Sequence, residues 1–131
     1  MITLEIHSTS QVEMLDVTAA VRRAIAASNV TDGLAVLFVP HTTAAVTINE
    51  NADPDVVRDL VMELNKIVPF ADGYRHSEGN SAAHLKSSLF GPSLTLIVEN
   101  GAPFLGTWQG IYFCEFDGPR QRRLHLKVVA G

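Results

Sequence analysis

The sequence predicts an α+β fold, namely a β-sandwich of mainly antiparallel sheets with flanking helices in the order ββαββααβββ. Helix-like segments are too few, and strand-like segments too many, for a doubly wound parallel sheet. The 131 residues are also too few for a (β/α)₈ barrel, which needs about 200 or more. Because 47% of the residues are hydrophobic, the chain can nevertheless bury a sizeable core.

The first half of the chain supplies four strands and one helix. Residues 2–18 alternate as two short strands around the polar turn Ser8 to Gln11. Thr18 is the expected N-cap of a helix that buries Val21 and Ile25 on one face. The apolar run 34–40 predicts a strand buried on both faces, and 44–48 continues as β-like sequence.

The second half supplies two helices and three strands. Asp53-Pro54 is an N-cap followed by proline at the first helical position, and an apolar stripe continues to about Val68. Residues 70–80 are polar and contain glycine, which predicts a loop. Asn80 or Ser81 then caps a short helix that extends to Leu89 and ends at Gly91-Pro92. The final strands are expected at 94–98, 111–116 and 124–129, with a turn at Asn100-Gly101.

Composition limits the functional classes. We expect a single domain over residues 1–131, with no membrane span and no signal peptide. The lone Cys114 cannot form an internal disulfide, so a cytoplasmic location is expected. We read it as a small buried hydrophobe.

The formal net charge of −4 is unevenly distributed. Residues 118–131 contain four bases and no acid: Arg120, Arg122, Arg123 and Lys127. These bases either steer an anion or protect a solvated strand edge. One short basic segment without interleaved aromatic residues does not predict nucleic-acid binding.

Histidines are the first candidates for chemistry, because imidazole titrates near neutrality and binds metals. His41 follows a buried strand directly, where its ring either points into a ligand site or hydrogen-bonds a carbonyl at the strand end, and Thr42 adds a hydroxyl group. His76 and Glu78 lie in the glycine-flanked loop, which can fold so that His76 approaches His84 in the next helix. Two imidazoles and a carboxylate can hold a catalytic divalent metal or act as acid and base without one. The alternative is a pair of surface histidines.

Other polar residues stand out by their position. Asn49 and Glu50 follow an apolar strand, where a carboxylate can act as ligand or base. Lys86 either contacts a phosphate near the helix N-terminus or is an ordinary exposed residue. Trp108 and Gln109 are bracketed by glycines, which let the backbone approach a ligand closely. Trp108 either contributes to this contact or fills the core, which is the ordinary role of a tryptophan. Glu115 is an acid on a strand, facing either the site or solvent.

The blocks HTTAAVTINENADPD, HSEGNSAAHLKSSLFG and GTWQGI, in this order, resemble the YjbQ family over residues 2–130. The resemblance implies a β-sandwich with flanking helices and a homotrimer with polar clusters near its subunit boundaries. It also implies a secondary thiamine-phosphate synthase activity. The family's polar positions fall on eleven residues: His41, Thr42, Asn49, Glu50, His76, Glu78, His84, Lys86, Trp108, Gln109 and Glu115. Ala82 stands where many members carry an acid.

The sequence leaves open whether the chain is an enzyme. The first hypothesis is a transferase acting on a phosphorylated small molecule. Its catalytic residues would be His41, His76, His84 and Glu50, and the three histidines would hold a zinc or magnesium ion. Substrate would be bound by Thr42, Asn49, Lys86, Gln109 and Trp108. The second hypothesis is a trimeric module that binds a small molecule or metal without physiological catalysis, and the third is an unliganded structural trimer.

Overall fold

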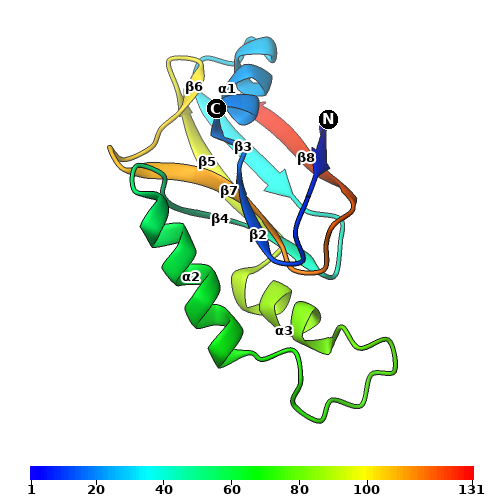
Figure 1. The fold of residues 1–131 in the computed structure, drawn as a ribbon. Coiled ribbons are helices and arrows are strands. Elements are labelled where there is room, and N and C mark those ends of the chain that lie inside the picture. Colours follow the sequence, from blue (N-terminus) through cyan, green and yellow to red (C-terminus); the bar gives the residue numbers. More distant parts are fainter.

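The computed structural model describes all 131 residues, Met1–Gly131, and confirms the α+β sandwich (Figure 1). Every strand pair is antiparallel. The larger sheet has the order β1 (Ile2–His7), β8 (Gln121–Ala130), β3 (Gly33–Phe38), β5 (Ser93–Glu99), β6 (Ala102–Pro103). The smaller sheet has the order β2 (Glu13–Asp16), β7 (Gln109–Glu115), β4 (Ala44–Glu50). None of the helices combines the length and apolar content that a membrane crossing requires.

Two apolar clusters hold the layers together. The main core lies between the two sheets and includes Leu37, Phe113 and Leu126, all fully buried. The helix α1 (Thr18–Ala27) contributes Val21 and Ile25 to this core, as predicted. A second cluster, around Cys114 and Phe116, packs the outer face of the smaller sheet against α2 (Pro54–Ile67) and α3 (Ser81–Phe90).

The sequence prediction was wrong about the cap of α1. Thr18 is the first helical residue, and its side chain makes no capping bond. Instead, Asp16 Oδ1 accepts hydrogen bonds from the Thr18 backbone N–H at 3.0 Å and from Thr18 Oγ1 at 2.6 Å. Thr18 Oγ1 in turn accepts a bond from the backbone N–H of Ile111, which ties the helix to β7. The cap of α2 was predicted correctly, since Asp53 accepts from the Asp55 N–H at 2.9 Å.

The strand β3 is buried on one face only, contrary to the prediction for 34–40. Ala35 and Leu37 point into the core, whereas Leu34, Val36 and Phe38 are 48%, 40% and 47% exposed. No element of the chain covers this outer face of the larger sheet, because both α2 and α3 pack on the smaller sheet (Figure 1). The apolar run therefore reflects one core face and one bare face.

The basic segment forms part of a central strand. Because β8 pairs with β1 on one side and β3 on the other, the reading of a solvated strand edge is wrong. Residues of β8 alternate in burial, and Arg122 points inward together with Leu124 and Leu126. The two-residue strand β6, which follows the predicted Asn100-Gly101 turn, was not predicted.

Candidate functional site

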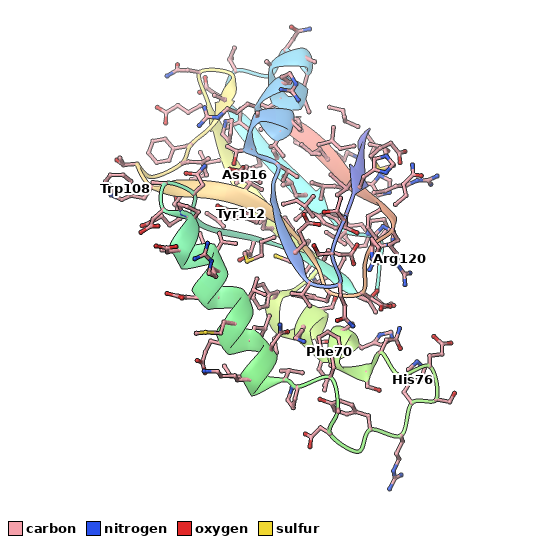
Figure 2. All side chains as sticks on the ribbon, in the orientation of Figure 1. Asp16, Phe70, His76, Trp108, Tyr112 and Arg120 are labelled. Carbon is pink, nitrogen blue, oxygen red and sulfur yellow. The ribbon has the colours of Figure 1, made fainter.

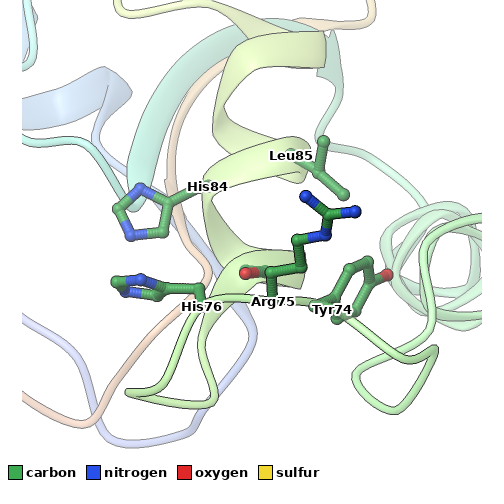
Figure 3. A pocket seen from close by; sticks show the side chains of 6 residues that line it. Tyr74, Arg75, His76, His84 and Leu85 are labelled. Atoms are coloured by element: carbon green, nitrogen blue, oxygen red, sulfur yellow. The ribbon is translucent and has the colours of Figure 1, made fainter.

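His76 and His84 form a ring pair at the end of the molecule that carries α3. Their ring centroids are 5.5 Å apart and the planes meet edge to face at 88°. The loop between α2 and α3 supplies His76, and the second turn of α3 supplies His84 (Figure 3). Glu78 Oε2 lies 3.7 Å from His76 Nε2. The predicted approach of the loop histidine to the helix histidine is therefore confirmed.

The ring pair opens onto a cavity of about 470 Å³. Tyr74, Arg75 and Ser81 line it beside the two histidines (Figure 3). Side-chain bonds fold the loop at both ends. Tyr74 donates its hydroxyl hydrogen to the Pro69 carbonyl at 2.6 Å, and Asn80 Nδ2 donates to Asp117 Oδ2 at 2.9 Å. Arg75 was not predicted as a site residue, although its position next to His76 was a signal for it.

His41 lies elsewhere, in the loop between β3 and β4. Its Nε2 accepts a hydrogen bond from the backbone N–H of Arg123 at 3.0 Å, so in the neutral ring the proton is on Nδ1. Burial and the nearby Arg122 charge lower the pKa of His41 below its ordinary value. The ring lines two adjoining hollows and does not line the His76–His84 cavity.

A buried ion pair supports the His41 loop. Glu115 and Arg122 are both buried, and Arg122 Nε donates to Glu115 Oε1 at 2.9 Å. Arg122 Nη2 also donates to the Thr43 carbonyl at 3.1 Å and to Thr43 Oγ1 at 2.8 Å. Ser8 Oγ completes the network by donating to Glu115 Oε1 at 2.7 Å. Glu115 therefore acts through Arg122 on the loop and is closed to solvent.

Burial by itself would raise the pKa of the Glu115 carboxyl. The hydrogen bonds from Arg122 and Ser8 outweigh that effect and hold the pKa below its ordinary value. Sequence reasoning left the orientation of Glu115 open and treated Arg122 only as part of a basic segment. The alternation of Arg122 with Leu124 and Leu126 was the signal that this arginine points inward.

Glu50, Asn49, Gln109 and Trp108 occupy a third place, at the far end of β4. Glu50 pairs with Gln109 in the ladder between β4 and β7. Since β4 rises about 3.3 Å per residue, its two ends lie about 20 Å apart, and Glu50 is a strand length from the His41 loop. Trp108 is exposed and lies at the opposite side of the molecule from His76 (Figure 2).

Two of the side chains at this third place accept hydrogen bonds from nearby backbone N–H groups. Gln109 Oε1 accepts from the Gly106 N–H at 2.8 Å, and Asn49 Oδ1 accepts from the Glu50 N–H at 2.7 Å. At Gly110 a side chain would collide with Asn51, since a Cβ there would lie 2.4 Å from Asn51 Nδ2. Gly110 therefore allows close packing of the backbone against Asn51 of the same chain in this structure.

Lys86 is fully buried, contrary to the reading of an ordinary exposed helix residue. Its Nζ has no hydrogen-bond partner and lies 3.6 Å from the centre of the Phe70 ring. Burial lowers the pKa of Lys86 to about 8. In this conformation the ammonium does not line the His76–His84 cavity, so Lys86 is closed to a phosphate there.

The predicted site residues thus fall into separate groups within one chain. His76 and His84 come together, His41 and Thr42 line a groove of their own, and Glu50 lies at the third place. No three His, Cys, Asp or Glu side chains lie close enough together to hold a metal ion. A metal site built from His41, His76 and His84 is consequently not assembled by one chain alone.

Comparisons with known proteins place the chain in a family. The model of the family described as UPF0047 protein YjbQ-like matches residues 2–131. The UPF0047 protein YugU of Bacillus subtilis is 51% identical over 128 residues, covering 97% of each chain. The UPF0047 protein MJ1081 of Methanocaldococcus jannaschii is 50% identical over 125 residues, covering 95% of this chain and 91% of that one.

Solved structures agree with this placement. A YjbQ/UPF0047 family protein from Clostridium acetobutylicum superposes with a TM-score of 0.96 at 51% identity, covering 98% of this chain and all of that one. The conserved hypothetical protein TT1486 of Thermus thermophilus gives 0.92 at 41% identity, with coverage of 98% and 100%. The expected resemblance is therefore confirmed, and the chain belongs to the UPF0047 family of YjbQ-like proteins.

Proposed function

We propose that the chain is an enzyme that binds and converts a phosphorylated small molecule in the His76–His84 cavity. The observation that carries this proposal is the imidazole pair, 5.5 Å between centroids, beside Arg75 in one open cavity. A guanidinium group binds phosphate oxygens in a bidentate manner, and paired imidazoles supply an acid and a base. The edge-to-face geometry leaves ring nitrogens available to a ligand.

A divalent metal fits this cavity only in part. Imidazole is a better ligand for zinc than for magnesium, which prefers oxygen, so the pair favours zinc of the two metals. One chain supplies two imidazoles, one fewer than the three protein ligands typical of catalytic zinc. We therefore assign His76 and His84 as the ligands that this chain would contribute and derive no reaction step through the metal.

The more specific proposal is a weak thiamine-phosphate synthase activity, in which a hydroxymethylpyrimidine diphosphate joins a thiazole phosphate and pyrophosphate leaves. The leaving group carries most of the negative charge. Arg75 is the cation of the cavity that would neutralise it, and His76 or His84 would transfer protons at its oxygens. The buried Lys86 is not available for this task unless the Phe70 loop moves.

The experiment measures thiamine phosphate formed from the two phosphorylated precursors by the purified protein, with and without added zinc or magnesium. We expect His76→Ala, His84→Ala and Arg75→Gln each to abolish most of the rate. His7→Ala, an exposed histidine on β1 outside the cavity, is the matched control and should leave the rate unchanged. Equal rates for all variants would refute catalysis at this cavity.

A second candidate is a binding module without physiological turnover. The burial of Lys86 favours it, because this lysine does not reach a phosphate in the His76–His84 cavity. Such a module would bind about one zinc ion per chain through His76 and His84 and show no rate that depends on them. Isothermal titration calorimetry with zinc, on the wild type and His84→Ala, tests the zinc binding, and the thiamine phosphate assay on the same two proteins separates this case from the enzyme. A cytoplasmic location remains our expectation from the single, buried Cys114.

We also propose that the chain assembles as a homotrimer through the bare face of the larger sheet. Leu34 on β3 is flanked in the ladders by Ile97 on β5 and Val129 on β8, and all three are about half exposed. A contiguous apolar strip of this kind is typical of an interface. Light scattering should give three times 14.2 kDa, and Val36→Lys on the same face should lower that mass.

A further inference from the structure

The groove beside His41 is separate from the His76–His84 cavity and carries no function so far. It consists of two adjoining hollows that share Pro40, His41 and Arg122. The larger hollow, about 610 Å³, is walled by the His41–Thr43 loop on one side and by Arg120 and Arg122 on the other. No carboxylate lines this hollow, whereas Glu5 lines the neighbouring one. An anion therefore meets no acidic side chain in its walls.

The groups left free in this hollow are hydrogen-bond donors. His41 Nε2 is occupied by the Arg123 N–H, so Nδ1 carries the proton of the neutral ring and has no partner in the chain. Arg120 uses Nε and Nη2 to bond Asp117, which leaves Nη1 free. The Thr42 hydroxyl has no partner either. Three free donors from two chain segments thus border one cavity.

The walls of the hollow are held in place before any ligand arrives. Arg122, buried against Glu115, donates two hydrogen bonds to Thr43 and so fixes the end of the loop that carries His41 and Thr42. At the other end of the loop, the Val39 N–H donates to the Pro92 carbonyl at 2.7 Å. Donors fixed in this way lose little entropy when they bind a ligand.

From this geometry we infer that the hollow is a binding site for a tetrahedral oxyanion, namely the phosphate group of a small molecule, held by His41, Thr42 and Arg120. Phosphate oxygens accept several hydrogen bonds at once, and a guanidinium is suited to them by shape and charge. The site needs no metal ion. It does not depend on the activity proposed for the His76–His84 cavity.

The test is titration of the full chain with inorganic phosphate, in EDTA and at low ionic strength, followed by calorimetry and by the ring NMR signals of the histidines. We expect binding in the millimolar range or tighter that perturbs His41. His41→Gln, Arg120→Gln and Thr42→Val should each weaken binding, by about tenfold for Arg120→Gln because it removes a charged donor. Thr42→Val should not unfold the chain, because Thr42 is exposed and its side chain makes no hydrogen bond. A loss of phosphate binding in this variant therefore reports on the groove itself.

The matched control for general charge is Lys127→Gln, which removes a cation from the same strand but lines neither hollow, and it should bind phosphate in the groove as the wild type does. Arg75→Gln removes the cation of the other cavity and separates the two sites, since the phosphate-dependent shift of the His41 ring signals should persist in it. Unchanged affinity in the three groove variants would overturn the assignment, as would loss of that His41 shift in Arg75→Gln alone. If the assignment holds while the synthase assay fails, only the proposed activity is refuted.

Discussion

The sharpest stability prediction concerns Lys86, whose ammonium is buried without a hydrogen-bond partner. Replacing it by methionine keeps an unbranched side chain of similar length and removes the charge. We expect Lys86→Met to stabilise the folded chain at neutral pH. The same substitution at an exposed lysine has no such effect, because an exposed charge keeps its hydration.

The magnitude follows from the pKa of Lys86, about 8 in the folded chain against the ordinary 10.5. At about 1.4 kcal/mol per pKa unit, holding the buried ammonium costs about 3 kcal/mol at pH 7. The contact of Nζ with the Phe70 ring, 3.6 Å from its centre, offsets some of that cost and is lost in the variant, at about 1–2 kcal/mol. The net gain expected for Lys86→Met is therefore about 1–2 kcal/mol.

The gain must shrink as the pH rises. Between about pH 8 and 10.5 the unfolded chain holds the lysine proton and the folded chain has lost it, so the wild type becomes more stable with increasing pH. By pH 10 the cost of the lysine has fallen to about 1 kcal/mol. The methionine variant lacks this pH dependence, so the two stabilities approach each other.

The assay is urea unfolding of both proteins at pH 7 and pH 10, at one chain concentration because association shifts apparent stability. Lys66→Met is the matched control, since Lys66 lies on α2 with its side chain 65% exposed, and we expect a change within about 0.5 kcal/mol. The reasoning is refuted if Lys86→Met is less stable than the wild type at pH 7. It is equally refuted if the difference is the same at both pH values.

Three further predictions test other parts of the structure. Glu115→Gln leaves Arg122 buried with an uncompensated charge and should cost about 3–5 kcal/mol in urea unfolding. Because the pKa of Glu115 is held below its ordinary value, this contribution is present above about pH 4.5 and is lost as the pH falls through the folded pKa. The reasoning would be contradicted if the wild type and Glu115→Gln lost the same amount of unfolding free energy at acid pH. Asp16→Ala removes the acceptor at the start of α1 and should cost about 1 kcal/mol by thermal unfolding, whereas Asp32→Ala, an exposed acid outside the helices, should cost almost nothing. Burial raises the pKa of the Cys114 thiol to about 12, so a thiol reagent at pH 8 should label it only after unfolding; rapid labelling of the native chain would show that β7 opens locally.

Local patterns predicted the elements well because each has a short-range cause. The Asp53-Pro54 cap, the Gly91 helix end and the Asn100-Gly101 turn depend only on neighbouring residues, and all three are present. The same holds for the approach of His76 to His84, because His84 follows only eight positions after His76 and one helix start lies between them. The cap of α1 was misplaced because the helix begins at Thr18, after the N-cap residue Val17, and the Thr18 hydroxyl bonds to Asp16 and to the backbone N–H of Ile111.

The wrong predictions of burial share a different cause, which is that the burial of a side chain depends on which distant part of the chain packs against it. The apolar run of β3 has the composition of a strand that is buried on both faces, yet no other element of the chain covers one of these faces. Lys86 and Arg122 show the opposite error, because charged residues are expected at the surface. Arg122 is buried with Glu115, 7 residues earlier in the chain, and with Thr43, 79 residues earlier, and no local pattern shows that second contact.

The distribution of the candidate residues constrains how a complete site can form. Glu50 lies about a strand length from His41, and neither lines the His76–His84 cavity, so no small movement of one chain unites the four. If all four residues serve one reaction, they must come from different copies of the chain. The strip of exposed apolar residues along β3, made of Leu34, Val36 and Phe38, ends next to the His41 loop. Assembly through that strip would bring a neighbouring chain to the edge of the phosphate groove. Val36→Lys, at a position that lines neither hollow, should therefore weaken both association and phosphate binding if the site is shared, and association alone if each chain holds a complete groove.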